Sequence, residues 1–147
     1  MSGSNDRSNA EDFAKSSITD VLHKICIVVD AYDSALFLPL WTVDAQLDFG
    51  ERYRGAPAGF IASLVESRSM TTAMTHELED ISIELASDRR TATSSCIVSA
   101  DVTRLSEDGE RRRLVRGRYE DRWVFTDSRW LIQHRTYRPT GETLLPA

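Results

Sequence analysis

Hydrophobic positions in the first part of the chain follow a helical period. Between residues 18 and 32 they recur at steps of three or four and form one broad face, as in an amphipathic helix: Ile18, Val21, Leu22, Ile25, Val28, Val29 and Tyr32. A short second helix is expected over residues 34–41, and a short strand follows in "TVDAQLDFG". Pro57 suits the first turn of a third helix that ends near Ser69.

After residue 70 the hydrophobic period changes from helical to two. The segments "THELEDISIEL", "TATSSCIVSADVTRL", "RRLVRGRYEDRWVF" and "RWLIQHRTYR" indicate four strands, joined by the turns "SDRR", "SEDGER" and "TDSR". Three consecutive hairpins make an antiparallel meander, and strands of this length favour a strongly curled sheet. The predicted fold class is α+β: a cone-shaped α+β barrel, with N-terminal helices packed on a strongly curled antiparallel sheet.

The length and composition indicate a single domain with short ends. A chain of 147 residues fits one domain, and no internal repeat is found. Residues 1–12 are rich in Ser, Gly, Asn and Asp and are expected to be disordered. The domain is expected to cover residues 13–138, which leaves residues 139–147 as a C-terminal tail.

Charge and hydropathy exclude two classes of partner. The net charge of −5 argues against nucleic acid, because phosphate contacts need a basic face. The basic run "RRRLVRGRYEDR" alternates with apolar residues, as the polar face of a strand does. No apolar run approaches the ~20 residues that span a membrane, and the polar N-terminus has no hydrophobic signal core. We therefore expect a cytoplasmic protein.

The cysteines and histidines do not predict a metal or cofactor site. Cys26 and Cys96 each lie in an apolar setting and are expected to be buried thiols that form no disulfide. His23, His76 and His134 are scattered without the spacing of metal ligands. No metal or other cofactor is predicted.

His76 lies near the start of the first long strand. Met74, His76 and Leu78 share one face of this strand, whereas the apolar residues from Ile81 onward fall on the other phase. The slip between Leu78 and Ile81 predicts a β-bulge, a device that often re-aims a side chain near a functional site. A lone histidine on a covered face is more often a packed core residue than a catalyst.

Asp30 is the candidate partner of His76. It lies four residues after Cys26 and eight after Leu22, so it continues the apolar face of the first helix. A carboxylate that is partly buried at the C-terminal end of a helix needs a compensating contact, and a histidine can supply one. Alternatively, Asp30 caps the following loop, although Asp33 is the more natural cap of the next helix.

Five motifs, in this order, resemble SnoaL-like proteins of the nuclear transport factor two superfamily. They are "VVDAYD", "VDAQLDFG", "YRGAPAGFIASL", "MTHELED" and the ending "GRYEDRWVFTDSRWLIQHRTY". The resemblance covers residues 15–138. It implies a cone-shaped fold and a homodimer, and within the superfamily the sequence is similar to scytalone dehydratase and hexachlorocyclohexane dehydrochlorinase.

The resemblance also implies a site. In those enzymes an aspartate at the end of the first helix orients a histidine that removes a proton from carbon, and Asp30 and His76 occupy the matching positions. Arg135 resembles the dehydrochlorinase arginine that lies against the departing group. Further candidate substrate contacts are the aromatic and apolar residues Tyr32, Phe37, Trp41, Phe49, Tyr53, Phe60, Leu64, Met74 and Tyr119. Tyr119 alternates with Asp121, so both are expected to face the interior.

The resulting hypothesis is a lyase or isomerase of the dehydratase type that needs no cofactor. Its partner would be a small hydrophobic molecule such as a polyketide, terpenoid or aromatic intermediate. Two alternatives share the fold: a non-catalytic binding or assembly module, and the small subunit of a ring-hydroxylating dioxygenase. Asp80 stands where many SnoaL-like sequences have asparagine and would change the polarity of the pocket if it faces inward, whereas Glu77 and Glu79 fall on the opposite face, which is expected to be solvated. The acid-rich "HELED" argues against an anionic substrate.

Overall fold

Helices precede strands along the chain, as the change of period predicts. The computed structural model describes residues 3–146, with side chains from Arg7 onward. The helices are α1 (Gly3–Asp30), α2 (Ser34–Phe37) and α3 (Pro57–Glu66), with single 3-10 turns η1 (Leu38–Leu40) and η2 (Arg68–Met70). The strands are β1 (Trp41–Asp48), β2 (Arg54–Gly55), β3 (Thr71–Leu85), β4 (Thr91–Ser106), β5 (Gly109–Thr126) and β6 (Arg129–Leu145).

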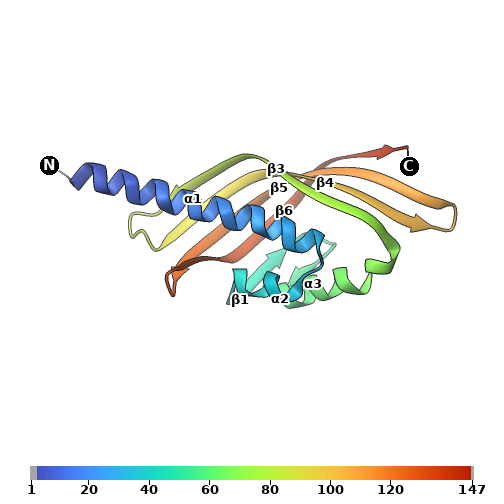
Figure 1. The fold of residues 1–147 in the computed structure, drawn as a ribbon, viewed down its shortest axis with the longest axis horizontal. Coiled ribbons are helices and arrows are strands. Elements are labelled where there is room, and N and C mark those ends of the chain that lie inside the picture. Colours follow the sequence, from blue (N-terminus) through green and yellow to red (C-terminus); the bar gives the residue numbers. More distant parts are fainter. Residues whose placement is uncertain (1–2, 147) are drawn as a thin grey trace.

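All six strands form one open, curled sheet in the order β2-β1-β6-β5-β4-β3. The predicted meander of β3 to β6 is confirmed, since each neighbouring pair is antiparallel. The sheet as a whole is mixed, because β1 pairs with β6 in parallel. The chain passes through α1, α2 and η1 before β1, and β1 then joins the sheet beside β6, the last strand. The helices lie on one side of the sheet, with α1 crossing it (Figure 1).

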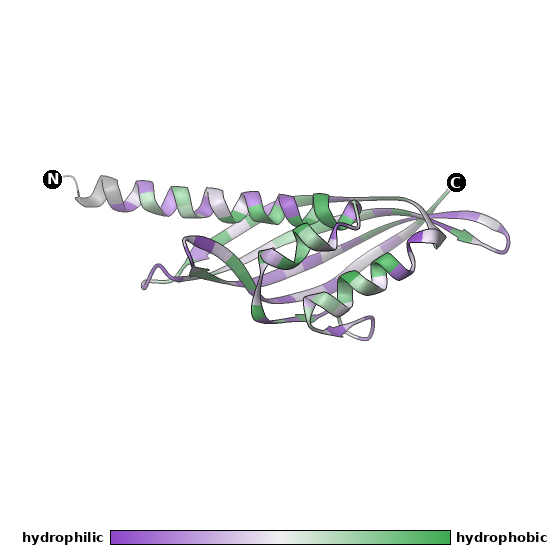
Figure 2. Cartoon of the chain, turned by 60° about the horizontal axis from the view of Figure 1, so that its bottom comes forward, coloured by the Kyte–Doolittle hydropathy of each residue, from purple (hydrophilic) through white to green (hydrophobic). Residues whose placement is uncertain are grey.

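The predicted disorder of residues 1–12 is wrong for residues 3–12, which form the first turns of α1. Helix propagation adds one hydrogen bond per residue, so the packed segment after Ile18 can extend into polar sequence. Figure 2 shows that apolar residues gather in the C-terminal half of α1. Residues 1–2 lie outside the described part of the chain.

The predicted C-terminal tail is also wrong over residues 139–145, because β6 continues to Leu145 and pairs there with Arg112 of β5. Pro139 lies opposite Gly117 at a register shift, where a missing N–H is tolerated. Of the predicted tail, Ala147 lies outside the described residues.

Two helix ends differ from the sequence prediction by a few residues. The second helix was expected to reach Trp41, but it ends at Phe37, and Trp41 begins β1. Pro39 explains this end, because it has no N–H to continue the helical bonds. The third helix starts at Pro57 as predicted and ends at Glu66, before the 3-10 turn η2.

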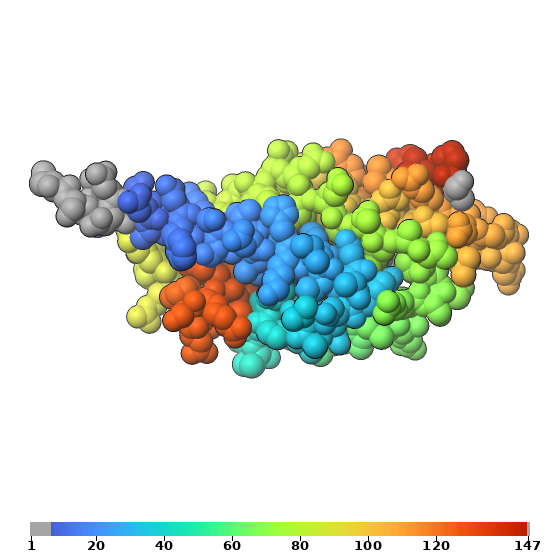
Figure 3. Space-filling view, in the orientation of Figure 1, coloured from blue at the N-terminus to red at the C-terminus, as the bar shows by residue number. Residues whose placement is uncertain are grey.

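The core fills the space between the helices and the concave face of the sheet. Its fully buried side chains come from both layers and include Ile18, Leu22, Phe37, Trp123 and Ile132. The helices and β1 form one continuous surface over this side of the sheet (Figure 3). Among the described residues, no helix has the combination of length and apolarity that crossing a membrane demands.

The predicted bulge in β3 is confirmed at Asp80, which has a φ of 53° and lies between register shifts at Glu79 and Ser82. The extra residue lets Leu78 and Ile81 pack against the same core although they fall on opposite phases. The phase of β4 that carries Cys96 and Val98 is buried. These two side chains therefore face the concave side of the sheet.

Gly117 in β5 is required by a close approach of β6. A Cβ atom at this position would meet the ring of Tyr137 and would lie 2.7 Å from the carbonyl oxygen of Arg138. We expect Gly117→Ala to lower the free energy of unfolding by about 1–3 kcal/mol, because the backbone carbonyl must move. Chemical denaturation measures the change. Gly141→Ala is the control, since a Cβ there has nothing within 4 Å, and an equal loss in both variants would contradict the steric explanation.

Candidate active site

Asp30 and His76 are in direct contact. Asp30 is the last residue of α1, and its Oδ1 lies 2.5 Å from His76 Nδ1. Its other oxygen, Oδ2, accepts a hydrogen bond of 3.0 Å from the backbone N–H of His76. Both side chains are mostly buried. A carboxylate can only accept hydrogen bonds, so the proton lies on Nδ1 and the lone pair of a neutral His76 ring lies on Nε2.

The local sequence explains why Asp30 is available for this contact. The N-cap of α2 is Asp33, whose carboxylate accepts a hydrogen bond of 3.0 Å from the N–H of Leu36. Asp30 is therefore not needed as the N-cap of α2. Its carboxylate is unfavourable at the C-terminal end of α1, and its two contacts with His76 of β3 offset this cost.

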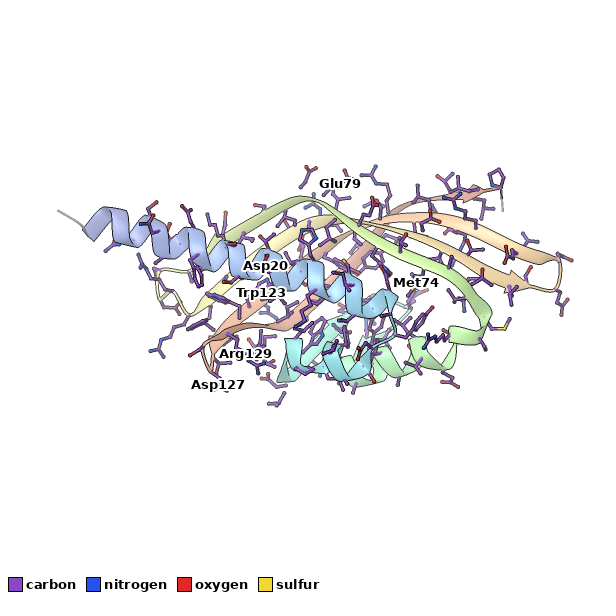
Figure 4. All side chains as sticks on the ribbon, in the orientation of Figure 1. Asp20, Met74, Glu79, Trp123, Asp127 and Arg129 are labelled. Carbon is purple, nitrogen blue, oxygen red and sulfur yellow. The ribbon has the colours of Figure 1, made fainter. Side chains whose placement is uncertain are left out.

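His76 faces a cavity of about 200 Å³ between the helices and the concave face of the sheet. Arg135 also lines this cavity, whereas Asp30 lies behind His76. Every side chain predicted to contact substrate lines it as well: Tyr32, Phe37, Trp41, Phe49, Tyr53, Phe60, Leu64, Met74 and Tyr119. Met74 points from β3 toward the helices, while Glu79 points away from them (Figure 4).

Aromatic rings make up much of the cavity wall. Phe49 contacts Phe60 at a centroid distance of 5.0 Å and Tyr137 at 5.6 Å, and Tyr137 contacts Tyr119 at 5.5 Å. Tyr53 donates a hydrogen bond of 2.5 Å to the carbonyl of Ala56, which ties the loop before α3. A large part of the cavity wall is therefore aromatic and apolar.

Arg135 forms a buried ion pair that sequence analysis did not predict. Its Nε and Nη2 donate to the two carboxylate oxygens of Asp121 at 2.7 Å and 2.9 Å, and its Cζ lies 3.8 Å from the centroid of Tyr119. Burial lowers the pKa of Arg135, but the charge and hydrogen bonds of Asp121 raise it more. Arg135 is thus a fixed positive charge at the cavity wall.

Burial keeps three other groups near Arg135 in their neutral form. Burial raises the pKa of Tyr119 well above its ordinary value, against the lowering effect of Arg135. Burial also raises the pKa of Cys26 to about 11 and that of Cys96 to about 12. The prediction of two buried free thiols is confirmed. Within the described residues, no group of His, Cys, Asp and Glu side chains could hold a metal ion.

The acids of "HELED" do not enter the cavity. Glu77, Glu79 and Asp80 are exposed on the outer side of β3. The sequence-based argument against an anionic substrate therefore does not apply.

Sequence analysis missed several cavity residues. Tyr137 follows Arg135 by two residues on β6, so strand alternation places it on the same face and could have identified it. Cys26 precedes Asp30 by one helical turn, and the same spacing could have placed it at the cavity. Arg52, Arg104 and Arg113 also line the cavity, but no periodic signal marks a loop residue such as Arg52.

The architecture is that of the nuclear transport factor 2-like α+β proteins, a curled sheet whose concave side is closed by helices around a cavity. The sequence gives the narrower assignment. The chain belongs to the SnoaL-like domain family, which matches residues 13–136. Among curated protein sequences, none matches the chain closely enough to indicate a relationship.

Three solved structures illustrate the shared fold. A scytalone dehydratase-like protein from Novosphingobium aromaticivorans has a TM-score of 0.82 at 16% identity, over 95% of this chain and 93% of that one. The hexachlorocyclohexane dehydrochlorinase LinA-type3 from Novosphingobium barchaimii has a TM-score of 0.79 at 17% identity, over 94% of each chain. A nuclear transport factor 2-like protein from Salmonella enterica has a TM-score of 0.72 at 17% identity, over 89% and 94%.

Proposed function

We propose that this protein is a lyase or isomerase that removes a proton from carbon in a small hydrophobic substrate, with His76 as the general base. The observation that carries the proposal is the contact of Asp30 with both the ring and the backbone of His76. This arrangement leaves Nε2 free at a cavity lined by aromatic rings. The names of two structural neighbours, a scytalone dehydratase-like protein and a dehydrochlorinase, support an elimination.

In the proposed reaction, Nε2 of His76 takes the proton as the C–H bond breaks. The electron pair forms a C=C bond, and a hydroxide or halide leaves from the neighbouring carbon. Asp30 stabilises the imidazolium that forms and keeps the ring in one tautomer. Arg135, held in place by Asp121, offers positive charge to the leaving group. In a dehydration the imidazolium proton would leave with the hydroxide as water.

The tautomer of His76 tests this proposal without a substrate. In the wild type, the ¹⁵N chemical shifts of the neutral ring should show a protonated Nδ1 and an unprotonated Nε2. In Asp30→Asn the amide oxygen should keep the bond to the His76 backbone N–H, because that group can only donate. The amide NH₂ then faces Nδ1, so the ring proton should move to Nε2 and occupy the lone pair needed for catalysis.

His23 is the internal control, since it is exposed on α1 and its signals should be the same in both proteins. A wild-type His76 with its proton on Nε2, or a ring unaffected by Asp30→Asn, would contradict the proposal. The non-catalytic binding module would then be the better account of the cavity.

The resemblance also predicts a homodimer, and the hydropathy of the sequence predicts a cytoplasmic location; we retain both as proposals. Sedimentation of the purified protein tests the first. A chain that is stable without a partner protein would argue against the role of a small oxygenase subunit.

A further inference from the structure

The cavity is positively charged in a protein that is negative as a whole. Among the side chains that the structure describes, its lining contains Arg52, Arg104, Arg113 and Arg135 but no aspartate or glutamate, although the chain has a net charge of −5. The charged side chains of the lining are therefore all of one sign, and their charge is complementary to that of an anion.

Strand register places two of these arginines relative to the proposed base. His76 pairs with Ala100 of β4, and Ala100 with Val115 of β5. Two residues further toward the β4–β5 turn, Met74 pairs with Val102, and Val102 with Arg113. Arg104 lies two residues beyond Val102 on the same face. Since two residues span about 7 Å of strand, Arg113 and Arg104 lie about 7 and 14 Å along the sheet from His76.

The end of the sheet at the β4–β5 turn is not covered by α1. The β4–β5 hairpin extends well past the C-terminal end of α1 (Figure 1). The Arg135–Asp121 pair and Tyr119 lie on the other side of His76, since Asp121 pairs with Ser94 and Tyr119 with Cys96 of β4. Along the strands, the cavity thus has the Arg135–Asp121 pair with Tyr119, then His76, and then Arg113 and Arg104, in that order.

Of the four arginines that line the cavity, two are paired with carboxylates of the protein. Arg135 is matched by Asp121, and Arg113 lies 3.1 Å from Glu142. Among the side chains of residues 7–146, no carboxylate lies within ion-pair distance of Arg52 or Arg104. Arg52 lies close enough to Tyr137 to oppose the rise in its pKa that burial causes. Two positive charges therefore border the cavity without a partner.

We infer that the substrate is amphipathic, with an aromatic or otherwise apolar body and a carboxylate. The body would pack among the aromatic rings, and the carboxylate would bind Arg104 or Arg52, the two lining arginines without an ion-pair partner, whose planar guanidinium groups suit a carboxylate. The carbon that loses its proton would then lie about 7–14 Å from the carboxylate, which is the length of two to four strand residues. This last point rests on the proposed function, whereas recognition of the carboxylate does not.

The test compares two probes of the same shape, naphthalene-1-carboxylate and the neutral naphthalene-1-carboxamide. Titration calorimetry of the wild type should show the carboxylate binding at least about tenfold more tightly, as expected of charge-assisted hydrogen bonds. The double variant Arg52→Gln/Arg104→Gln should lose this preference and keep its affinity for the carboxamide. Arg118→Gln, an exposed arginine on the outer face of β5, is the matched control and should behave as the wild type.

Equal binding of the two probes would overturn the inference. A loss of preference in Arg118→Gln as large as in the double variant would also overturn it, because the overall charge and not the site would then be responsible. The preference should persist in His76→Ala. If it disappears there, the imidazole and not the arginines binds the anion. The tautomer of His76 is measured independently, so failure of either proposal can be recognised separately.

Discussion

Replacing Asp121 by alanine should lower the free energy of unfolding by about 3–5 kcal/mol. The carboxylate of Asp121 is fully buried, and the guanidinium of Arg135 is nearly so. Without Asp121, a buried positive charge would remain beside the rings of Tyr119 and Trp41 without its carboxylate partner. The desolvation of that charge, and not the lost attraction alone, sets the size of the effect.

Equilibrium denaturation in urea measures the loss, and the chain contains a matched control. Asp101 also forms a two-bond ion pair, with Arg112, but at the exposed surface. Asp101→Ala should change stability far less, because solvent screens the remaining charge. A double replacement, Asp121→Leu with Arg135→Met, should recover most of the stability that Asp121→Ala loses. A loss in Asp121→Ala no greater than in Asp101→Ala would mean that water reaches Arg135.

The largest expected effect on activity is that of His76→Ala. Compounds with an acidic C–H next to a carbon bearing hydroxyl or halide can be incubated with the protein in D₂O and followed by ¹H NMR. For any compound that the wild type converts or deuterates, we expect His76→Ala to lower the rate by about 10²–10⁴-fold, the usual contribution of a positioned general base.

His23→Ala should react at the wild-type rate, since His23 is exposed on α1 and does not line the cavity. Asp30→Asn should fall between the two, because it keeps the imidazole but reverses its tautomer. Conversion that continues unchanged in His76→Ala would exclude His76 as the base. Near-ultraviolet circular dichroism of each variant would show whether its packing is preserved.

The parts of the fold that depend on local periodicity could be predicted from the sequence. The helix–strand order, the meander and the bulge at Asp80 follow from the spacing of apolar residues, because period and burial are linked. The ends of the chain were misjudged for the opposite reason. Residues 3–12 and 139–145 have polar compositions, but both continue an element that packing or strand pairing has already established.

Contacts between distant segments explain most of what the sequence could not show. The parallel pairing of β1 with β6 depends on where the preceding helices place β1 relative to the sheet. Arg135 and Asp121 pair across two strands, and only the register brings them opposite each other. The contact of Asp30 with His76 could be anticipated because both residues interrupt apolar faces. Its second bond, to the His76 backbone, could not, because backbone groups leave no mark on the sequence.

The close packing of Gly117 against Tyr137 has an evolutionary consequence. The ring of Tyr137 lies in the cavity wall only because residue 117 has no side chain. A larger residue at position 117 would be tolerated only if position 137 became smaller and the β6 backbone shifted. The two positions should therefore covary among homologues, and paired exchanges there would be a short route by which the family changes the size of molecule it accepts.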